Sequence, residues 1–307
     1  MTQIEVVFLG TTAGVPTKKR NHASVFLKYQ SEQEYHCLFD CGEGTQRQML
    51  FAGVNFMRIS DIFITHWHAD HFAGLLGLME TMNLEGRKEA LNIYAPEAEK
   101  FVDILLSMGY STKDFDVVPK DVWHEGIEKQ TLLDEAEFRI TAMPMKHSIP
   151  AVAYAFEEKD RVKIDREKAK KLGLPEKHKI YRDIKEKGSA VFQGKEITFE
   201  DISFMEKGKK VVYSGDTTVN KNMLRLAENA DMLIHDSTFF GEEEEEEKNY
   251  RHAGFEDAIG LAKQARVKQL VLTHISRRYQ NEQLLKDKIS DFRNVRIADD
   301  LMRIVVK

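Results

Sequence analysis

Four potential metal ligands lie within six residues of this chain, in the segment HWHADH at positions 66–71. Neutral imidazole is the commonest protein ligand for zinc, and a carboxylate oxygen can complete or bridge a metal site. His66 and His68 are two residues apart, so both side chains leave the same side of an extended segment. Asp70 and His71 follow where the chain must turn. The segment predicts two neighbouring metal sites, and the alternative is a solvated loop that is merely rich in histidine.

Three further candidate ligands each follow an apolar run later in the chain, namely His147, Asp216 and His274. For each residue taken singly, the alternative is a buried side chain that is hydrogen-bonded within the core. Active sites of α/β proteins gather where strands end in loops. The recurrence of candidate ligands at strand ends therefore predicts that they share one rim.

The elements that must position these residues are strands and helices in two comparable halves. Apolar and period-two runs predict strands at 4–9, 24–29, 36–39, 59–64 and 91–94, then at 211–213, 232–235, 269–273 and 302–306. Helical spacing predicts helices at 44–52, 74–82 and 97–108, then at 221–228, 255–265 and 281–290. Two such halves predict an α/β protein with two mixed sheets face to face and helices outside.

Length and composition are those of an ordinary globular protein, with 307 residues of which 42% are hydrophobic and 31% are charged. No apolar stretch approaches the roughly 20 residues of a membrane span, and the sequence does not open on a basic-then-apolar signal. We therefore expect a cytoplasmic protein with no membrane partner. Cys37 and Cys41 lie four residues apart, which favours reduced, structural thiols over a disulfide or a thiolate zinc site.

Positive charge is concentrated between the two halves, although the net charge of the chain is −5. Residues 159–187 contain twelve Lys or Arg against six Asp or Glu, whereas residues 242–247 form an unbroken acidic run. Phosphate backbones respond to such local patches more than to total charge. We expect a single domain with halves at about 1–156 and 196–307, and an inserted, projecting basic arm at 157–195. The alternative for the arm is a solvated pair of surface helices.

Several segments together resemble one protein family. Beside HWHADH, they are FLGTTAGVPTKKRN at 8–21, FDCGEGTQRQ at 39–48, SGDT at 214–217 and THISRRY at 273–279. The metal-ligand pattern resembles the metallo-β-lactamase superfamily of dinuclear metal hydrolases, whose fold is an αββα sandwich. Within that superfamily the chain resembles the ribonuclease Z family, the endonucleases that trim the 3′ trailer from precursor tRNA. The similarity spans nearly the whole chain except the insertion.

The resemblance implies two Zn²⁺ ions per chain, with Mn²⁺ or another divalent metal as the alternative, and no organic cofactor. It assigns one zinc to His66, His68 and His147, the other to Asp70, His71 and His274, and places Asp216 between them. It further implies that Asp40 holds a metal-binding imidazole in position, and that His252 and Asp236 handle protons. Precursor tRNA is the implied substrate and a homodimer the implied assembly.

Basic residues next to an aromatic ring suit single-stranded RNA, which is recognised by backbone charge and base stacking. The expected substrate contacts are Ser276, Arg278 and Tyr279, to a lesser degree Lys18, Lys19, Arg20 and Arg47, and in the arm Lys170 and Lys171. The cationic residues would hold phosphates, Ser276 would donate a hydrogen bond and Tyr279 would offer a stacking face. For Arg47 and Tyr279 the alternative is a packing role.

The expected reaction is hydrolysis of a phosphodiester, because two cations about 3.5 to 4 Å apart activate a water and neutralise the phosphoryl oxygens. Asp70 would be a ligand and also the acceptor of the water's proton. His252, oriented by Asp236, would protonate the leaving ribose oxygen, leaving a 3′-hydroxyl on the tRNA and a 5′-phosphate on the trailer. The nearest alternative is a phosphodiesterase of the same fold that acts on small or cyclic nucleotide diesters. A second alternative is an RNA-binding protein without turnover.

Overall fold

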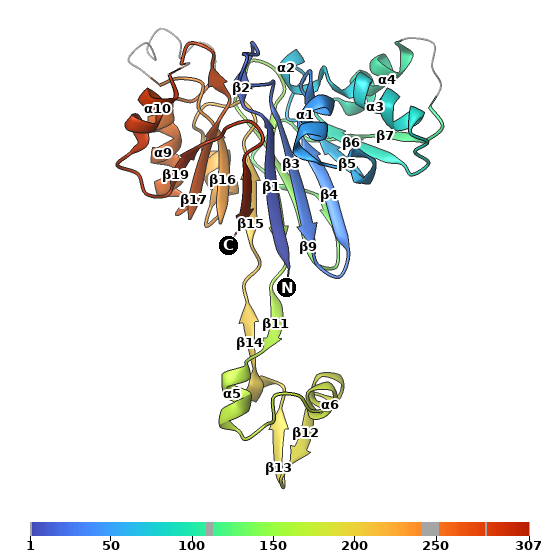
Figure 1. Ribbon diagram of the computed structural model, residues 1–307, viewed down its shortest axis with the longest axis vertical. Helices are drawn as coiled ribbons and strands as arrows, with labels where there is room; N and C mark the ends of the chain where they lie inside the picture. The colour runs from blue at the N-terminus through green and yellow to red at the C-terminus, as the bar shows by residue number, and fades with distance from the viewer. Residues whose placement is uncertain (1, 109–112, 241–251, 280, 307) are drawn as a thin grey trace. The chain divides into compact units, whose positions relative to one another are not determined.

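The computed structural model describes residues 2–108, 113–240, 252–279 and 281–306 and is drawn in Figure 1. The chain forms two compact units. The larger comprises Met1–Glu135, Arg139–Glu157 and Lys210–Lys307, and the smaller comprises Ala136–Phe138 and Glu158–Lys209. The acidic run at 242–247 lies outside the described residues. None of the described helices has both the length and the apolar character needed to cross a membrane.

The first sheet of the larger unit has seven strands in the order β20-β1-β3-β4-β5-β6-β7. In that order they span Arg303–Val306, Gln3–Gly10, Ser24–Gln30, Glu34–Phe39, Asp61–Phe63, Leu91–Ala95 and Val117–Asp121. Pairings from β20 to β4 are antiparallel, and those from β4 to β7 are parallel. The parallel half brings the carboxyl ends of β4 and β5 to the same edge of the sheet.

The second sheet also has seven strands, in the order β19-β17-β16-β15-β10-β9-β8. In that order they span Val295–Ile297, Gln269–Thr273, Met232–Asp236, Lys210–Tyr213, Val152–Glu158, Phe138–Pro144 and Gln130–Asp134. Strands β15, β16, β17 and β19 are parallel, whereas β10 is antiparallel to β15 and β8 to β9. A separate short pair joins β2 (Thr12–Ala13) in parallel to β18 (Ile275–Ser276).

Helices cover the outer faces of the two sheets within the larger unit (Figure 1). On the first sheet they are α1 (Thr45–Ala52), α3 (Leu75–Leu84) and α4 (Ala98–Ser107), and on the second α7 (Lys221–Ala227), α9 (Phe255–Gln264) and α10 (Glu282–Ile289). Strand β1 contributes side chains to both faces of its sheet, because successive side chains along a strand point in opposite directions. Val7 and Leu9 join the core beneath the helices, while Phe8 between them is buried on the opposite face.

Aromatic rings fill the space between the two sheets. The ring of Tyr154 on β10 lies 5.3 Å from that of Phe63 on β5 and 6.1 Å from that of Phe39 on β4. The rings of Tyr29 on β3 and Phe156 on β10 lie 5.3 Å apart. All five residues are buried. The predicted architecture of two facing mixed sheets with helices outside is confirmed.

The smaller unit has a core of its own. It contains the antiparallel pairs β11 (Arg161–Ile164) with β14 (Ser203–Glu206) and β12 (Ser189–Phe192) with β13 (Lys195–Thr198), and the helices α5 (Arg166–Lys171) and α6 (Ile180–Lys187). The buried apolar residues that form this core are Ala169, Leu174, Ile180, Ile184, Ile197 and Ile202. The unit continues to Lys209, beyond the end at 195 expected from the sequence. The concentration of Lys and Arg in the sequence identifies only the basic part of the smaller unit. Strands β13 and β14 also belong to this unit, because they pair with β12 and β11.

Candidate metal centre

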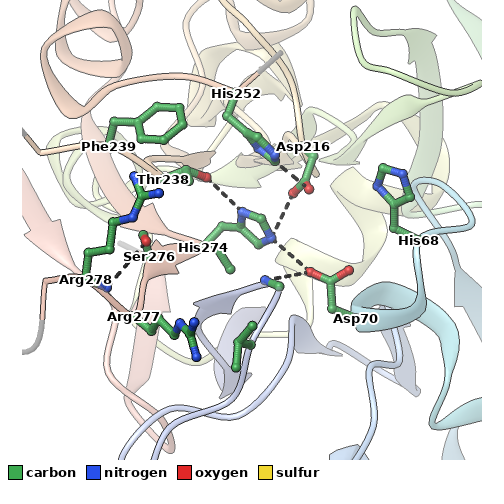
Figure 2. Close-up of a pocket in the computed structure, with 13 residues that line it drawn as sticks. His68, Asp70, Asp216, Thr238, Phe239, His252, His274, Ser276, Arg277 and Arg278 are labelled. Carbon is green, nitrogen blue, oxygen red and sulfur yellow. Dashed lines mark hydrogen bonds and ion pairs between the residues drawn. The ribbon is translucent and has the colours of Figure 1, made fainter. Parts of the chain in front are cut away.

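The predicted metal ligands lie where strands of the larger unit end. His66 follows β5, His147 follows β9, Asp216 follows β15 and His274 follows β17, while His68, Asp70 and His71 lie at or in the short helix α2 (Ala69–Phe72). Figure 2 shows His68, Asp70, Asp216 and His274 around one pocket. The structure therefore brings together residues that are up to about 200 positions apart in the chain.

Three imidazoles and one carboxylate form the first ligand set. His68 Nδ1 lies 3.0 Å from His66 Nε2 and 3.1 Å from His147 Nε2. Asp216 Oδ2 lies 3.6 Å from His66 Nε2. Burial, with the neighbouring imidazoles, lowers the pKa of His66 well below its usual value. His66 is therefore held neutral, which is the form that binds metal.

The second ligand set adjoins the first through Asp216. His274 Nε2 lies 3.4 Å from His71 Nε2 and 3.3 Å from Asp70 Oδ2. Asp216 Oδ1 lies 3.3 Å from each of these two imidazole nitrogens. Burial lowers the pKa of His71, but the carboxylates of Asp216, Asp40 and Asp70 raise it well above its usual value. The carboxylates therefore give the second set a negative electrostatic potential, which favours a positive charge there, whether of a proton or of a metal ion.

The hydrogen-bonding pattern of these side chains fits divalent metal. Where two ring nitrogens lie 3.0 or 3.4 Å apart, at most one of them can carry a proton toward the other, so each pair presents at least one lone pair inside the ligand set. Within the described part of the chain, Asp216 Oδ1 is buried without a hydrogen-bond partner. A buried carboxylate oxygen without a donor is costly, and a bound cation removes that cost. Imidazole and carboxylate donors are those that zinc accepts.

Asp40 holds His71 on the side away from the ligand set. Asp40 Oδ2 accepts hydrogen bonds from His71 Nδ1 at 2.7 Å and from the Tyr213 hydroxyl at 2.8 Å. Its Oδ1 accepts one from the Thr65 amide at 2.7 Å. Asp40 is fully buried with a φ of 55°, a left-handed conformation that a non-glycine residue keeps only when its surroundings hold it. Because His71 Nδ1 donates to Asp40, Nε2 is the ring nitrogen that faces the ligand set, 3.3 Å from Asp216 Oδ1.

His252 and Asp236 form a pair beside Asp216. His252 Nδ1 lies 2.8 Å from Asp236 Oδ2 and 3.8 Å from Asp216 Oδ2. Burial lowers the pKa of His252, but these two carboxylates raise it by more than burial lowers it, so the pKa lies above its usual value. By distance alone the pair could join a metal site. However, Asp236 already accepts hydrogen bonds from the Thr217 amide and from the amide and hydroxyl of Thr238, which favours an orienting role.

Basic side chains line one side of the pocket that contains the ligands. This pocket has a volume of about 360 Å³ and includes Ser276, Arg277 and Arg278 (Figure 2). A second cavity of about 740 Å³ shares Ser276 and Arg277 and adds the 16–20 loop and Tyr279. The two segments meet because β2 and β18 pair in parallel. Arg277 lines both cavities and was not predicted, although it lies within the THISRRY segment.

Two of the predicted phosphate contacts have other partners. Arg20 is 9% exposed, and its guanidinium donates to Thr11 Oγ1 at 2.7 Å and to Asp299 Oδ1 at 2.8 Å. These bonds anchor its loop to the body of the unit. Arg47 lies on α1 with its guanidinium carbon 5.2 Å from the centre of the Phe51 ring, and it is not among the residues that line either cavity.

The remaining predicted substrate contacts lie in different places. Lys170 and Lys171 end helix α5 of the smaller unit, where Lys170 lines a cavity of about 480 Å³. Tyr279 lines the second cavity of the larger unit, and its ring lies 5.6 Å from that of Phe240. Tyr279 therefore combines the two roles that the sequence left open, packing and exposure toward a possible ligand.

The chain is similar over nearly its whole length to curated relatives named ribonuclease Z. The relative from Methanothermobacter thermautotrophicus is 40% identical, with 99% of this chain and 97% of the relative covered. The relative from Archaeoglobus fulgidus is 39% identical, with 98% and 97% covered. The chain belongs to the ribonuclease Z family.

Solved structures and family models agree with membership of the ribonuclease Z family. The crystal structure of human tRNase Z, short form, matches with a TM-score of 0.72 and 27% identity, covering 99% of each chain. A family model described as Anti-Pycsar protein Apyc1 matches residues 4–181, and one described as Beta-lactamase superfamily domain matches residues 187–275. The first match covers more than half of the chain, so the chain falls within that family model too. The predicted family and metallo-β-lactamase fold are confirmed, and the His and Asp cluster supports a divalent metal.

Proposed function

We propose that this chain is a zinc-dependent endoribonuclease that removes the 3′ trailer from precursor tRNA and holds two Zn²⁺ ions. The observation that carries the proposal is the convergence of seven side chains into two adjoining ligand sets that share Asp216. The adjoining pocket is lined by Arg277 and Arg278, which suits an anionic substrate. Family membership supports RNA as that substrate.

Two metals would be held by His66, His68 and His147 on one side, by Asp70, His71 and His274 on the other, and by Asp216 between them. When bound, the metals lower the pKa of a coordinated water and neutralise phosphoryl oxygens. Only two of the seven ligands are carboxylates, so the ligands cancel only part of the charge of two divalent cations. A site with surplus positive charge favours a phosphodiester over a neutral substrate.

Asp70 is proposed to accept a proton at Oδ2. The amide of Gly14 donates a hydrogen bond to Asp70 Oδ2 at 2.9 Å, which orients the carboxylate toward His274. His252 lies across the pocket from Asp70 (Figure 2) and is proposed to protonate the leaving ribose oxygen. Asp236, 2.8 Å from His252 Nδ1, fixes the orientation of the imidazole and stabilises its charged form. The products are a 3′-hydroxyl on the tRNA and a 5′-phosphate on the trailer.

Substrate contacts are proposed at two places. Beside the ligands, Ser276 and Arg278 would hold the phosphates next to the scissile bond, and Tyr279 would stack on a base. In the smaller unit, Lys170 and Lys171 would contact the phosphates of the folded tRNA and read its shape rather than its sequence. A homodimer is part of the proposal, and light scattering of the purified chain tests it.

The experiment that tests the proposal uses one precursor tRNA labelled at its 5′ end. Purified protein is incubated with it in the presence and absence of a chelator, and the ends of the products are mapped. We expect one cut at the start of the trailer that the chelator abolishes and added Zn²⁺ restores. Equal cleavage in chelator would refute a metal-dependent reaction. A higher kcat/KM on a small chromogenic phosphodiester than on precursor tRNA would favour the phosphodiesterase alternative.

A further inference from the structure

Two buried threonine hydroxyls each lie between a carboxylate and the imidazole of a predicted metal ligand. Thr65 Oγ1 lies 2.9 Å from Asp40 Oδ2 and 3.1 Å from His66 Nδ1. Both Thr65 and Asp40 are fully buried. The hydroxyl therefore has no access to solvent and must satisfy its single proton and its lone pairs with these two neighbours.

The same arrangement occurs in the second sheet with different residues. Thr238 Oγ1 lies 2.7 Å from Asp236 Oδ1 and 3.0 Å from His274 Nδ1. Thr238 is 7% exposed and Asp236 is fully buried. Asp40 and Asp236 thus play matching parts, because each also accepts a hydrogen bond directly from a second imidazole, that of His71 or of His252.

The direction of these hydrogen bonds follows from the number of protons. An ionised carboxylate only accepts, so a hydroxyl oxygen 2.7 to 2.9 Å away must donate its one proton to it. The hydroxyl can then only accept from the imidazole, which requires a proton on Nδ1 of His66 and of His274. The lone pair of each neutral ring is consequently at Nε2, the atom that lies in the ligand set.

We propose that Thr65 and Thr238 are positioning residues that select the metal-binding tautomer of His66 and His274. This inference rests on the proposed metal centre, but it concerns how the ligands are prepared. Each hydroxyl relays the charge of a buried carboxylate to an imidazole and fixes the orientation of the ring. Partners of this kind typically change metal affinity about 10- to 100-fold when they are removed.

The two threonines act on different ligand sets. Thr65 supports His66, which belongs to the set that contains His68 and His147. Thr238 supports His274, which belongs to the set that contains Asp70 and His71. Removing one hydroxyl should therefore weaken one of two binding steps and leave the other close to that of the wild type.

The test measures Zn²⁺ affinity by competition with a chromophoric chelator, which is a readout independent of RNA cleavage. Thr65→Val and Thr238→Val keep the side-chain volume and remove the hydroxyl. We expect each to weaken one of two Zn²⁺ sites by about 10- to 100-fold, and Thr65→Ser and Thr238→Ser to restore most of it. Thr141→Val is the matched control, because that buried hydroxyl donates to the carboxylate of Glu157 and contacts no predicted metal ligand. Its Zn²⁺ affinities should equal those of the wild type.

A measurement on the unaltered protein covers the case in which a valine variant does not fold. In the Zn²⁺-loaded wild type, the Nδ1–H protons of His66 and His274 should appear in ¹H–¹⁵N spectra and exchange slowly with solvent. Rapid exchange of both protons, or valine variants that bind Zn²⁺ within twofold of the wild type, would overturn the inference. If the wild type itself bound no Zn²⁺, the proposed function would fail with it, so the two failures are distinguishable.

Discussion

Replacing His252 by alanine should slow catalysis while leaving the metal centre intact. His252 lines the pocket, its side chain is 17% exposed, and its Nδ1 lies 2.8 Å from Asp236 Oδ2. In our proposal the imidazole donates a proton to the leaving ribose oxygen, so its removal forces water to supply that proton. None of the hydrogen bonds that orient His66, His71 or His274 involves His252.

The expected magnitude comes from the role and from what remains after the change. A positioned general acid contributes about 10²- to 10⁴-fold, which corresponds to roughly 3 to 5 kcal/mol in the activation free energy. Asp236 keeps its hydrogen bonds from Thr238 Oγ1 at 2.7 Å and from the Thr217 amide at 3.2 Å. The carboxylate is therefore not left without partners, and we expect the fold to be retained.

The assay is single-turnover cleavage of labelled precursor tRNA at saturating enzyme, together with elemental analysis of zinc in the same preparation. His124→Ala serves as the control, since His124 lines neither cavity of the site. Loss of zinc from the His252→Ala protein would place His252 among the metal ligands. This alternative has a structural basis, because potential ligand atoms of His252, Asp216 and His274 lie close together. A variant with full zinc and an unchanged cleavage rate would refute the proton-donor role outright.

Three further outcomes follow from the structure. Asp216→Ala should lower the zinc content from the proposed two equivalents to less than one, because Asp216 is the residue that the two ligand sets share. Elemental analysis of wild type and variant checks this, and two retained equivalents would contradict it. Tyr213→Phe removes a hydrogen bond to buried Asp40 and should lower the free energy of unfolding in urea by about 1.5 to 3 kcal/mol, the usual range for a charged acceptor. Loss of less than about 0.5 kcal/mol would show that Asp40 does not depend on this donor. Replacing both Lys170 and Lys171 by alanine should weaken binding of precursor tRNA and leave hydrolysis of a small chromogenic diester unchanged. The slope of log K against log salt concentration should become less steep by roughly 0.7 to 0.9 per lost phosphate contact. Equal loss on both substrates would count against a tRNA-binding role for these lysines.

Four of the candidate metal ligands, His66, His147, Asp216 and His274, were predictable because each lies shortly after an apolar run that forms a strand. His66 after β5 and His274 after β17 show this most clearly. Parallel pairing brings such strand ends to one edge, so residue type and position in the chain were sufficient to predict that the ligands meet. The fold was predictable for a similar reason, since alternating strands and helices in two halves leave few ways to bury both faces of two sheets.

Arg20 is a residue whose role the sequence alone does not distinguish. A basic residue in a glycine-containing loop resembles a phosphate contact, yet its guanidinium turns inward to Asp299, 279 positions away. The smaller unit also extends beyond residue 195, because β14 pairs with β11 about 40 residues earlier and contains none of the Lys or Arg that marked the segment. Both features depend on partners that are remote in the chain.

By itself, the sequence determined which candidate metal ligands this protein carries, their order along the chain and the family to which it belongs. These are local properties, because a short motif already specifies which donor atoms are available. Only the tertiary structure decided which nitrogen of His66 and of His274 faces the candidate metal position. That choice depends on the hydroxyls of Thr65 and Thr238 lying within 3.1 Å of a ring nitrogen and within 2.9 Å of a carboxylate on a separate segment or turn. Asp40 lies 25 positions before Thr65 and His274 lies 36 positions after Thr238, so these two contacts arise from the packing of the strands and loops.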